Sequence, residues 1–394
     1  MPQRKSLDRM RSEGTEMEDS FVISWYRTNF GNEDVQKLAE SVQKGHISMG
    51  PVTGEFENKI GAALGVPYIV ATTSGSVALL MALMALGIKN GDEVIIPNRT
   101  WIATAHAPIM LGATVALVDV LPDIPIIDTS LIRRKITSNT KAIIPVPLNG
   151  RAVDMEEVWK IADEYGLFVI EDAAQALLSI NSGTYMGTQS DVGCFSLSMP
   201  KLIPTGQGGF IATKNRKTFE NLKRIRMHGV DDVIHCTYHQ MGFNFRLTDL
   251  QSSLGLVQLA NVQQRVDRLK KVYQKYESSI KEFEFLKLIP VDIPKGQVPL
   301  YVEVLCSERE KLIAFLASKG IQTRPFYPNL DTAVHLGCSE EFPNSKIFGD
   351  QGMMLPCGPD QPFENIDRVI EMLGMFEKEY HLRTACKNQS LSNH

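Results

Sequence analysis

Lys201 is the residue of this chain most suited to covalent chemistry. It lies in the stretch FSLSMPKLIPTGQGG (195–209), after an apolar run that is typical of a β-strand, and three glycines follow it within eight residues. A lysine amine can bond covalently to a carbonyl compound, and glycines let the backbone turn tightly around such a site. Many lysines at strand ends are simply exposed, so the interpretation depends on which other residues the fold brings close.

A second group of interest is TTSGSVALL (72–80), in which Ser74, Gly75 and Ser76 stand between a predicted strand and a predicted helix. The N-terminus of a helix offers unpaired N–H groups and the positive end of the helix dipole, and small residues let a phosphate approach. The same residues would also serve as an ordinary helix N-cap. The sequence leaves both interpretations open.

Two adjacent carboxylates, Glu171 and Asp172, end the apolar strand in VIEDAAQA (169–176). Because side chains alternate along a strand, at most one of them faces a shared site. That carboxylate could bind a metal, act as a base, pair with a cationic ring nitrogen or cap a helix. No histidine or second carboxylate has a suitable spacing for metal ligation, so we predict no metal site.

Trp101, in NRTWIATA (98–105), begins a predicted helix after another strand. Such a tryptophan either packs in the core or stacks on a flat ligand ring. A lysine, a carboxylate, a phosphate cradle and an aromatic plate are together what a pyridoxal phosphate site requires. In such a site the lysine forms a Schiff base with the cofactor, and the carboxylate keeps the pyridine nitrogen protonated.

The elements that must position these residues follow an alternating pattern. Over the first two thirds of the chain, apolar β-branched runs alternate with helical stretches. Strands are predicted at 66–72, 92–97, 113–120, 141–148, 167–172, 191–198 and 208–215, and helices at 76–88, 101–112 and 155–166. This pattern predicts an α/β fold with a mostly parallel sheet covered on both faces, whose ligands bind beyond the carboxyl ends of the strands.

A long helical stretch from about Leu247 to Phe283 is expected to leave this first domain. The remaining chain, with a strand at 299–306 and helices at 307–320 and 363–380, is expected to form a smaller α+β domain. We therefore predict a disordered tail at 1–20, a large cofactor-binding domain at 21–262, a small C-terminal domain at 263–383 and a flexible tail at 384–394.

The composition of the 394 residues is that of an ordinary globular protein, with 43% hydrophobic and 22% charged residues and a net charge of −4. The absence of a basic stripe argues against nucleic-acid binding. The six cysteines show no metal-binding spacing and are typical of reduced thiols. Without an apolar leader or an 18-residue apolar run, we expect a soluble cytoplasmic protein with no membrane partner.

From about residue 22 to 380 the chain resembles the DegT/DnrJ/EryC family, which consists of fold-type-I pyridoxal phosphate enzymes, mostly sugar aminotransferases. The most specific stretches are GHISMGPVTGEFENKIGAALGVPYIVATTSGSVAL, GDEVIIPNRTWIATAHAPIMLGATVALVDV, VIEDAAQAL, GTQSDVGCFSL and MGFNFRLTDLQSSLGLVQL. The resemblance implies a large domain with a mostly parallel seven-stranded sheet, a smaller C-terminal α+β domain, and pyridoxal 5′-phosphate as cofactor.

The resemblance also implies roles for single residues. Lys201 would be the Schiff-base lysine, and Asp172 would pair with the ring nitrogen. Gln175 would lie near the ring hydroxyl, and Trp101 would stack on the ring. The phosphate would lie at Ser74, Gly75, Ser76 and Ser196, and Asn244 would reach it from a second subunit, which implies a homodimer with shared active sites.

The activity that the resemblance implies is ping-pong transfer of an amino group from an amino acid, glutamate, to a keto sugar. The acceptor would be a nucleotide-linked keto hexose or a related sugar such as an 8-oxo-octulosonate, used in cell-surface polysaccharide or lipopolysaccharide biosynthesis. Two alternatives are a non-catalytic cofactor-binding regulator and a sugar lyase or dehydratase. The dehydratases carry histidine at the lysine position, so Lys201 disfavours them. The chain differs from the residues that are most common in the family at Pro147, Leu202 and Gln207.

Overall fold

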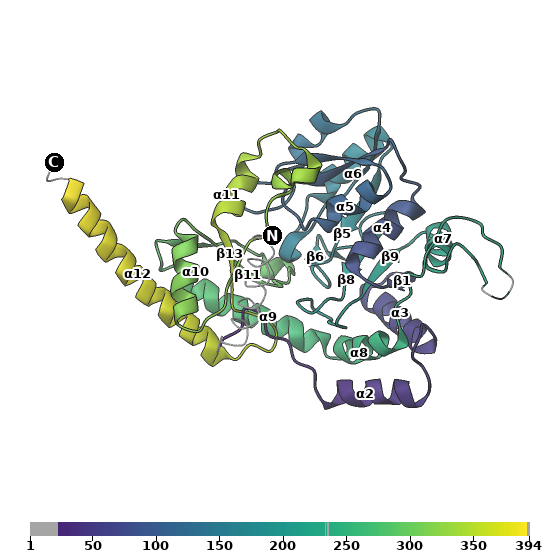
Figure 1. Cartoon of the computed structure of the whole chain (residues 1–394), viewed down its shortest axis with the longest axis horizontal. Coiled ribbons are helices and arrows are strands. Elements are labelled where there is room, and N and C mark those ends of the chain that lie inside the picture. The colour runs from purple at the N-terminus through teal and green to yellow at the C-terminus, as the bar shows by residue number, and fades with distance from the viewer. Residues whose placement is uncertain (1–22, 233, 235, 392–394) are drawn as a thin grey trace, which may run out of the picture.

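The computed structural model describes residues 23–232, 234 and 236–391, with side chains up to residue 379. Its larger part, on the right in Figure 1, is built on a seven-stranded sheet of order β1-β9-β8-β5-β4-β2-β3. In chain order these strands are β1 (Tyr68–Thr72), β2 (Glu93–Pro97), β3 (Thr114–Val118), β4 (Thr140–Ile143), β5 (Phe168–Asp172), β8 (Val192–Ser196) and β9 (Gly209–Thr213). Only β9 runs antiparallel to its neighbours. The predicted mostly parallel sheet is confirmed.

Both faces of this sheet are covered because its strands are apolar on both sides. On one face, Val70, Ile96 and Ile170 pack with α4 (Gly75–Ala85), α5 (Ala103–Met110) and α7 (Arg216–Arg226). On the opposite face, Ile69, Ile95 and Val169 pack with α3 (Pro51–Leu64), α6 (Met155–Tyr165) and α8 (Asp249–Ala260). This layered core holds the carboxyl ends of the parallel strands at one edge.

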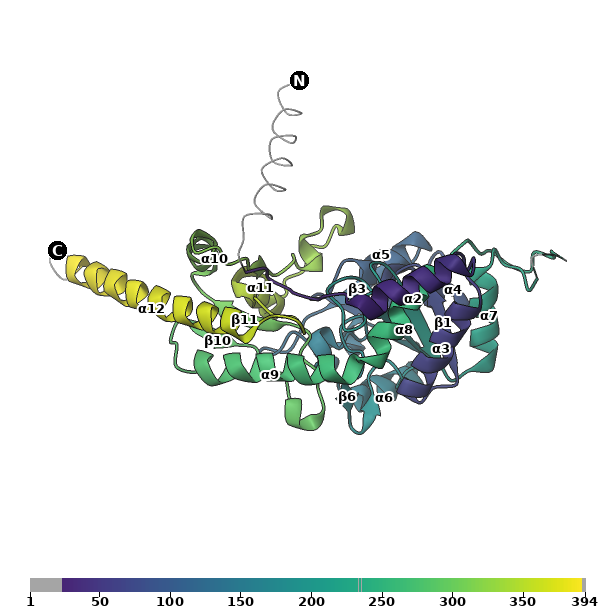
Figure 2. The same cartoon turned by 90° about the horizontal axis from the view of Figure 1, so that it is seen from below.

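The stretch from about Leu247 to Phe283 is helical as predicted, but it is divided into two helices. A capping box of Thr248 and Gln251 starts α8, and α9 (Val262–Ile280) follows after Asn261. The Asn261 side chain donates a hydrogen bond of 3.2 Å to the Val257 carbonyl oxygen. The same oxygen also accepts the backbone N–H of Asn261, at 3.3 Å, so Asn261 caps the end of α8 with two of its donors. From there α9 runs to the second part of the chain (Figure 2).

The second part has a four-stranded antiparallel sheet of order β10-β11-β13-β12. Its elements are β10 (Leu286–Leu288), β11 (Val302–Cys306), α10 (Arg309–Ser318), β12 (Arg324–Pro325), α11 (Pro343–Gln351), β13 (Gly352–Leu355) and α12 (Phe363–Leu391). It has its own core, which includes Val304, Leu312 and Leu373. The predicted smaller α+β unit is therefore present.

The start of the described chain lies with this second part. Backbone bridges join Ile23 to Ile321 and Tyr26 to Cys357. The other elements are α2 (Asn32–Gln43) and a short hairpin of β6 (Ile180–Asn181) and β7 (Thr184–Tyr185). The predicted tails at 1–20 and 384–394 lie outside the residues whose side chains are described. The domain boundaries at 262 and 383 stay predictions.

A buried ion pair joins the two parts. Arg151, in the loop after β4, places Nη1 at 2.6 Å from Oε2 of Glu303 on β11. The Arg151 guanidinium also donates to the carbonyl oxygens of Ile289 and Pro290, at 3.1 and 2.8 Å. Both charged side chains are buried, so each depends on the other for compensation of its charge.

We expect Arg151→Met to lower the free energy of unfolding by about 3–5 kcal/mol, because Glu303 would stay buried without its partner. Urea denaturation measures this loss. Lys59→Met is the matched control, since it breaks an exposed pair with Glu55 and should cost less than about 1 kcal/mol. Equal losses in the two variants would show that the buried pair does not stabilise the fold.

Candidate active site

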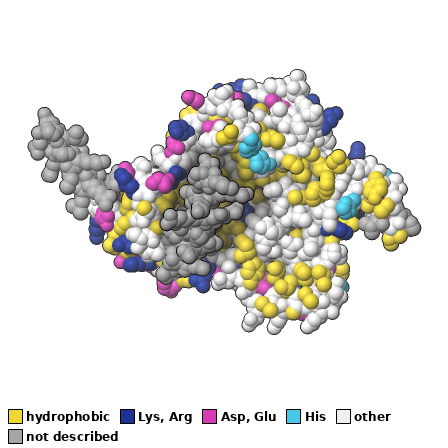
Figure 3. Space-filling view, viewed as in Figure 1, with side chains coloured by type: hydrophobic (Ala, Val, Ile, Leu, Met, Phe, Trp, Pro, Cys, Tyr) yellow, Lys and Arg dark blue, Asp and Glu magenta, His cyan; other side chains and the backbone are white. Residues whose placement is uncertain are grey.

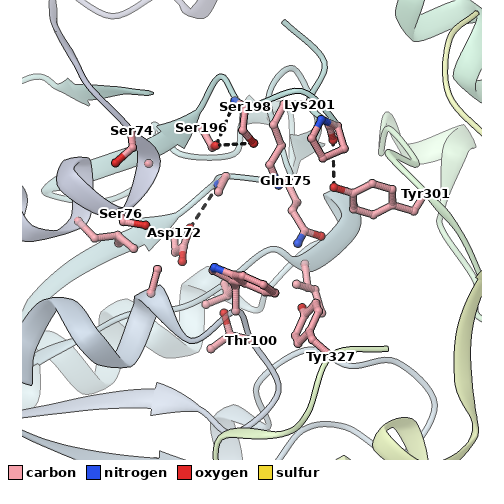
Figure 4. Close-up of a pocket in the computed structure, with 18 of the residues that line it drawn as sticks. Ser74, Ser76, Thr100, Asp172, Gln175, Ser196, Ser198, Lys201, Tyr301 and Tyr327 are labelled. Atoms are coloured by element: carbon pink, nitrogen blue, oxygen red, sulfur yellow. Dashed lines mark hydrogen bonds between the residues drawn. The ribbon is translucent and has the colours of Figure 1, made fainter. Parts of the chain in front are cut away.

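A cavity of about 420 Å³ lies beyond the carboxyl ends of the parallel strands, between the two parts of the chain. Eight of the nine residues predicted for the site line it, namely Ser74, Gly75, Ser76, Trp101, Asp172, Gln175, Ser196 and Lys201. Figure 4 shows most of these side chains around one space. The ninth, Asn244, does not line the cavity of its own chain.

One end of the cavity is formed by the start of α4. The Ser74 hydroxyl accepts a hydrogen bond of 3.2 Å from the Val77 N–H, so Ser74 is the N-cap of this helix. The N–H groups of Gly75 and Ser76 precede the first intrahelical bond and belong to the unpaired donors of a helix start. The helix thus begins with an ordinary cap and also offers an anion site.

Glycine at position 75 lets β8 approach this helix start. A Cβ atom at Gly75 would lie 2.9 Å from Cβ of Ser196, closer than real side chains come. On the neighbouring strand, a Cβ at Gly209 would lie 2.6 Å from the Ser74 carbonyl oxygen. The two glycines therefore let backbone and small hydroxyl side chains form a tight cradle, whose size and donors suit a phosphate group.

The two carboxylates at the end of β5 point in different directions, as the alternation predicted. Glu171 accepts hydrogen bonds from the backbone N–H groups of Gly187 and Gln189, at 2.7 and 2.9 Å, so it holds a neighbouring loop. Asp172 lines the cavity instead. Its Oδ2 accepts from the Thr104 hydroxyl at 2.7 Å, and its Oδ1 accepts from the Ala174 N–H at 3.3 Å.

The charge of Asp172 has little compensation in the cavity. Burial raises its pKa, although the hydrogen bonds from Thr104 and Ala174 and the charge of Lys201 act in the opposite direction. A buried carboxylate of this kind is stabilised by a cationic partner. A protonated ring nitrogen would be such a partner.

Lys201 stands on a backbone that is anchored on both sides. The Tyr301 hydroxyl donates to the Pro200 carbonyl oxygen at 3.0 Å, and Nε of Arg265 donates to the Leu202 carbonyl oxygen at 2.9 Å. Burial lowers the pKa of Lys201 to about 8, and the charge of Asp172 partly opposes this shift. At pH 7 about a tenth of the amine is therefore in the neutral, nucleophilic form, far more than for an ordinary lysine.

The aromatic residues of the site leave a flat surface uncovered. Trp101 is 55% exposed, and its ring meets that of Tyr327 edge to face, with ring centroids 5.4 Å apart. A planar ligand in the cavity could cover the remaining indole surface. These features together fit pyridoxal phosphate. The cradle suits its phosphate, Asp172 its cationic ring nitrogen, the Trp101 face its flat ring and Lys201 its carbonyl group.

Asn244 lies on the segment 227–246, which projects beyond α7 in Figure 1. Its Oδ1 accepts a hydrogen bond of 2.7 Å from Nε of Arg246, and its backbone bridges to Met227. The predicted contact with a phosphate in a second subunit stays a prediction.

Several cavity residues were not predicted from the sequence, namely Trp25, Thr100, Ser198, Tyr301, Arg324 and Tyr327. Ser198 had a usable signal, because it follows Ser196 by two positions at the end of a strand. Trp25 comes from the N-terminal segment, and Tyr301, Arg324 and Tyr327 come from the second part of the chain. Nothing in their local sequence indicates that they reach Lys201.

Comparison with known proteins agrees with this geometry. The sequence profile of the DegT/DnrJ/EryC1/StrS aminotransferase family matches residues 28–374. GDP-perosamine synthase of Escherichia coli O157:H7 is 33% identical over 366 residues, which cover 90% of this chain and 98% of that protein.

Two solved structures are also similar. DesV of S. venezuelae, in complex with a ketimine intermediate, superposes with a TM-score of 0.83 at 29% identity and covers 88% of this chain and 94% of DesV. NtdA of Bacillus subtilis, with bound cofactor PMP, has a TM-score of 0.82 at 26% identity, over 92% of this chain and 88% of NtdA.

The fold and the site define a pyridoxal phosphate-dependent aminotransferase of fold type I, which confirms the predicted enzyme class and cofactor. The chain belongs to the DegT/DnrJ/EryC1/StrS aminotransferase family. Within the described residues, no three or more His, Cys, Asp or Glu side chains are grouped to hold a metal ion. In the same part of the chain, none of the helices has the length and apolar character needed to cross a membrane.

In the chain without cofactor, we expect the Lys201 amine to be acylated with a pH midpoint near 8, well below the roughly 10.4 of an ordinary lysine. Only the deprotonated amine reacts, so reactivity rises as the pH passes through the pKa. Asp172→Asn removes the charge that raises the Lys201 pKa and should move the midpoint lower still. Peptide mass spectrometry measures both, with exposed Lys59 as the reference, and equal midpoints for the two lysines would contradict the assignment.

Proposed function

We propose that this aminotransferase moves an amino group from glutamate to a nucleotide-linked keto hexose or a related keto sugar, in two half-reactions with ping-pong kinetics. The observation that carries the proposal is the placement of partly buried Lys201 and buried Asp172 in one cavity with the open start of α4. The name of the relative GDP-perosamine synthase supports a nucleotide-linked sugar and a role in cell-surface polysaccharide synthesis.

Pyridoxal phosphate, when bound, supplies the electron-withdrawing ring that makes the exchange of the amino group feasible. Lys201 would hold the cofactor covalently and, once displaced by the donor, take the proton from the donor Cα. A pKa of about 8 suits this work, because a general base is most effective when its pKa lies close to the working pH.

The remaining residues would bind and orient the cofactor. Asp172, held by Thr104 and Ala174, would keep the ring nitrogen protonated. Trp101 would cover one face of the ring, and Gln175 would donate to the ring oxygen. The phosphate would be bound by the start of α4 and the hydroxyl at the end of β8, with Ser74, Gly75, Ser76 and Ser196 as its surroundings.

The acceptor sugar would bind nearer the cavity mouth. Arg324 and Trp25 line the cavity there, with the guanidinium carbon 4.6 Å from the indole centroid. Within the described lining, Lys201 and Arg324 are the two cationic side chains. Because a nucleotide-linked sugar carries phosphate charge outside its reacting sugar, we assign Arg324 to that charge.

We also propose a homodimer in which each site receives Asn244 from the partner. Exposed apolar side chains on the projecting segment support this arrangement, and Figure 3 shows them at the right edge of the molecule. They are Ile234, Tyr238, Met241 and Phe243. Contact with a second copy would cover them. A cytoplasmic location is supported by Cys194, Cys306 and Cys357, which are buried thiols outside any disulfide.

Lys201→Ala should abolish the glutamate half-reaction, because no other lysine lines the described cavity to take the proton. The absorbance change of bound cofactor on addition of glutamate measures this half-reaction. Thermal unfolding should stay close to that of wild type, and Lys59→Ala is a control for removal of an exposed lysine. Appreciable conversion in Lys201→Ala would overturn the assignment of the lysine.

A mixture of subunits tests the shared site. If Asn244 serves the partner, a dimer of one Lys201→Ala chain and one Asn244→Ala chain contains one site with both wild-type residues. Random pairing yields about half mixed dimers, so co-expression should restore up to roughly a quarter of wild-type activity. Verified mixed dimers no more active than the average of the two parents would show that Asn244 does not act across the dimer.

A further inference from the structure

Asn149 lies in the loop VPLNG after β4, at the seam between the two parts of the chain, and is completely buried. Its backbone has φ 56° and ψ 33°, in the left-handed region where asparagine is one of the few tolerated side chains. The next residue, Gly150, also has a positive φ, and a Cβ there would lie 2.2 Å from the Val298 carbonyl oxygen. The loop therefore packs directly against the chain that leads into β11.

Both ends of the Asn149 amide are used. Its Oδ1 accepts a hydrogen bond of 2.7 Å from the Tyr301 N–H, and its Nδ2 donates to the Tyr301 carbonyl oxygen at 3.1 Å. The same Nδ2 donates to Oε2 of Glu303 at 3.0 Å. Because the amide has one acceptor end and one donor end, these partners fix its orientation and hold the left-handed backbone in place.

The backbone N–H of Asn149 points to the cofactor site. It donates a hydrogen bond of 3.0 Å to Oε1 of Gln175, whose side chain lines the cavity (Figure 4). With its oxygen occupied in this way, Gln175 presents its NH₂ group, whose two hydrogens can serve the nearby Tyr327 phenol and a ligand. A flipped amide would turn an oxygen toward the ligand and leave the Asn149 N–H facing an NH₂ group.

The contact with Tyr301 connects Asn149 to the catalytic lysine as well. The Tyr301 hydroxyl donates to the Pro200 carbonyl oxygen at 3.0 Å, one residue before Lys201. Nζ of Lys201 lies 5.9 Å from the centroid of the Tyr301 ring. One buried asparagine thus contacts two residues that line the cavity, Gln175 and Tyr301.

We propose that Asn149 is a positioning residue that sets the NH₂ group of Gln175 toward the ring oxygen of the cofactor. This inference rests on the proposed function, in which Gln175 contacts that oxygen. The left-handed backbone of Asn149 directs its N–H to the Gln175 oxygen. The Asn149 side chain holds this backbone in place through its hydrogen bonds to Tyr301 and to Glu303 on β11.

The consequence is a defined spectroscopic effect. The Gln175 NH₂ group, as a hydrogen-bond donor, stabilises the negative ring oxygen of the cofactor. This stabilisation is strongest when the group next to that oxygen has lost its proton. The donor therefore lowers the pH at which the bound cofactor loses that proton. Misplacing the donor should raise that pH midpoint. The charged groups around Gln175 in the structure are Asp172 and Lys201 in the cavity, with Glu303 and Arg151 behind Asn149. The Tyr327 phenol also faces Gln175.

The test is a double-mutant cycle on the pH midpoint of the absorbance of bound pyridoxal phosphate. Asn149→Gly tolerates the left-handed backbone and removes the three side-chain hydrogen bonds. We expect it to raise the midpoint by on the order of half a pH unit. Gln175→Ala should raise the midpoint at least as much, and the double variant should add nothing to Gln175→Ala.

Gln258→Ala is the matched control, because it removes another buried side-chain amide. Gln258 lies on α8, away from the cavity, and donates a hydrogen bond of 2.8 Å to Asp34 on α2. This control variant should leave the midpoint unchanged. Asn149→Asp is the second variant in case the glycine variant does not fold. It keeps the size of the side chain and the acceptor for the Tyr301 N–H but places a carboxylate beside Glu303, and we expect the same upward shift.

An unchanged midpoint in a folded Asn149 variant, or a shift that persists undiminished in the Gln175→Ala background, would overturn the role of Asn149. Failure of the proposed function has a different signature. A wild-type chain that does not bind pyridoxal phosphate, or does not convert it with glutamate, would reject the proposed function and this inference with it.

Discussion

Lys201 and Asp172 are charged groups buried in one cavity, and removing each of them from water costs free energy unless other groups compensate. Hydrogen bonds from Thr104 and Ala174 compensate the charge of Asp172 only in part. The pKa of Lys201 is lowered, so its amine loses its charge more easily. The cavity is therefore complementary to a ligand that brings a cationic ring and a carbonyl group. The alignment of β5 and β8 and the anchored backbone around Lys201 serve to keep these two groups in place.

The part of the site that the sequence predicted is the part built from strand ends. Parallel strands bring their carboxyl ends to one edge, so Ser74 and Asp172 could be placed together without a structure, while Ser196 was assigned through the family resemblance. Because side chains alternate along β5, it could also be predicted that Asp172 and Glu171 do not both face the site. These inferences need only local periodicity and one rule of sheet topology. The strands were likewise predicted from their apolar runs, with bounds that differ by only a few residues, whereas their assembly into one seven-stranded sheet was implied by the family resemblance.

Other features depend on contacts between distant segments. Tyr301 and Tyr327, which lie beside β11 and β12, reach the cavity because the second part of the chain packs against the first, which no local pattern reveals. The break at Asn261 was not predicted because the helical pattern of the sequence continues through it. The left-handed backbone of Asn149 was hidden for a similar reason, since it is held by partners more than a hundred residues away.

The ion pair of Arg151 and Glu303, with Asn149 beside it, closes the seam between the two sheets with buried polar groups. Swinging the sheets apart would break several of these bonds at once, and each broken partner would lie in a poorly hydrated environment. Separating the two sheets along this seam would therefore cost free energy in each catalytic cycle. Traffic of donor, acceptor and products must pass through the cavity mouth, where side chains such as Trp25 and Arg324 can change rotamer far faster than two sheets can separate.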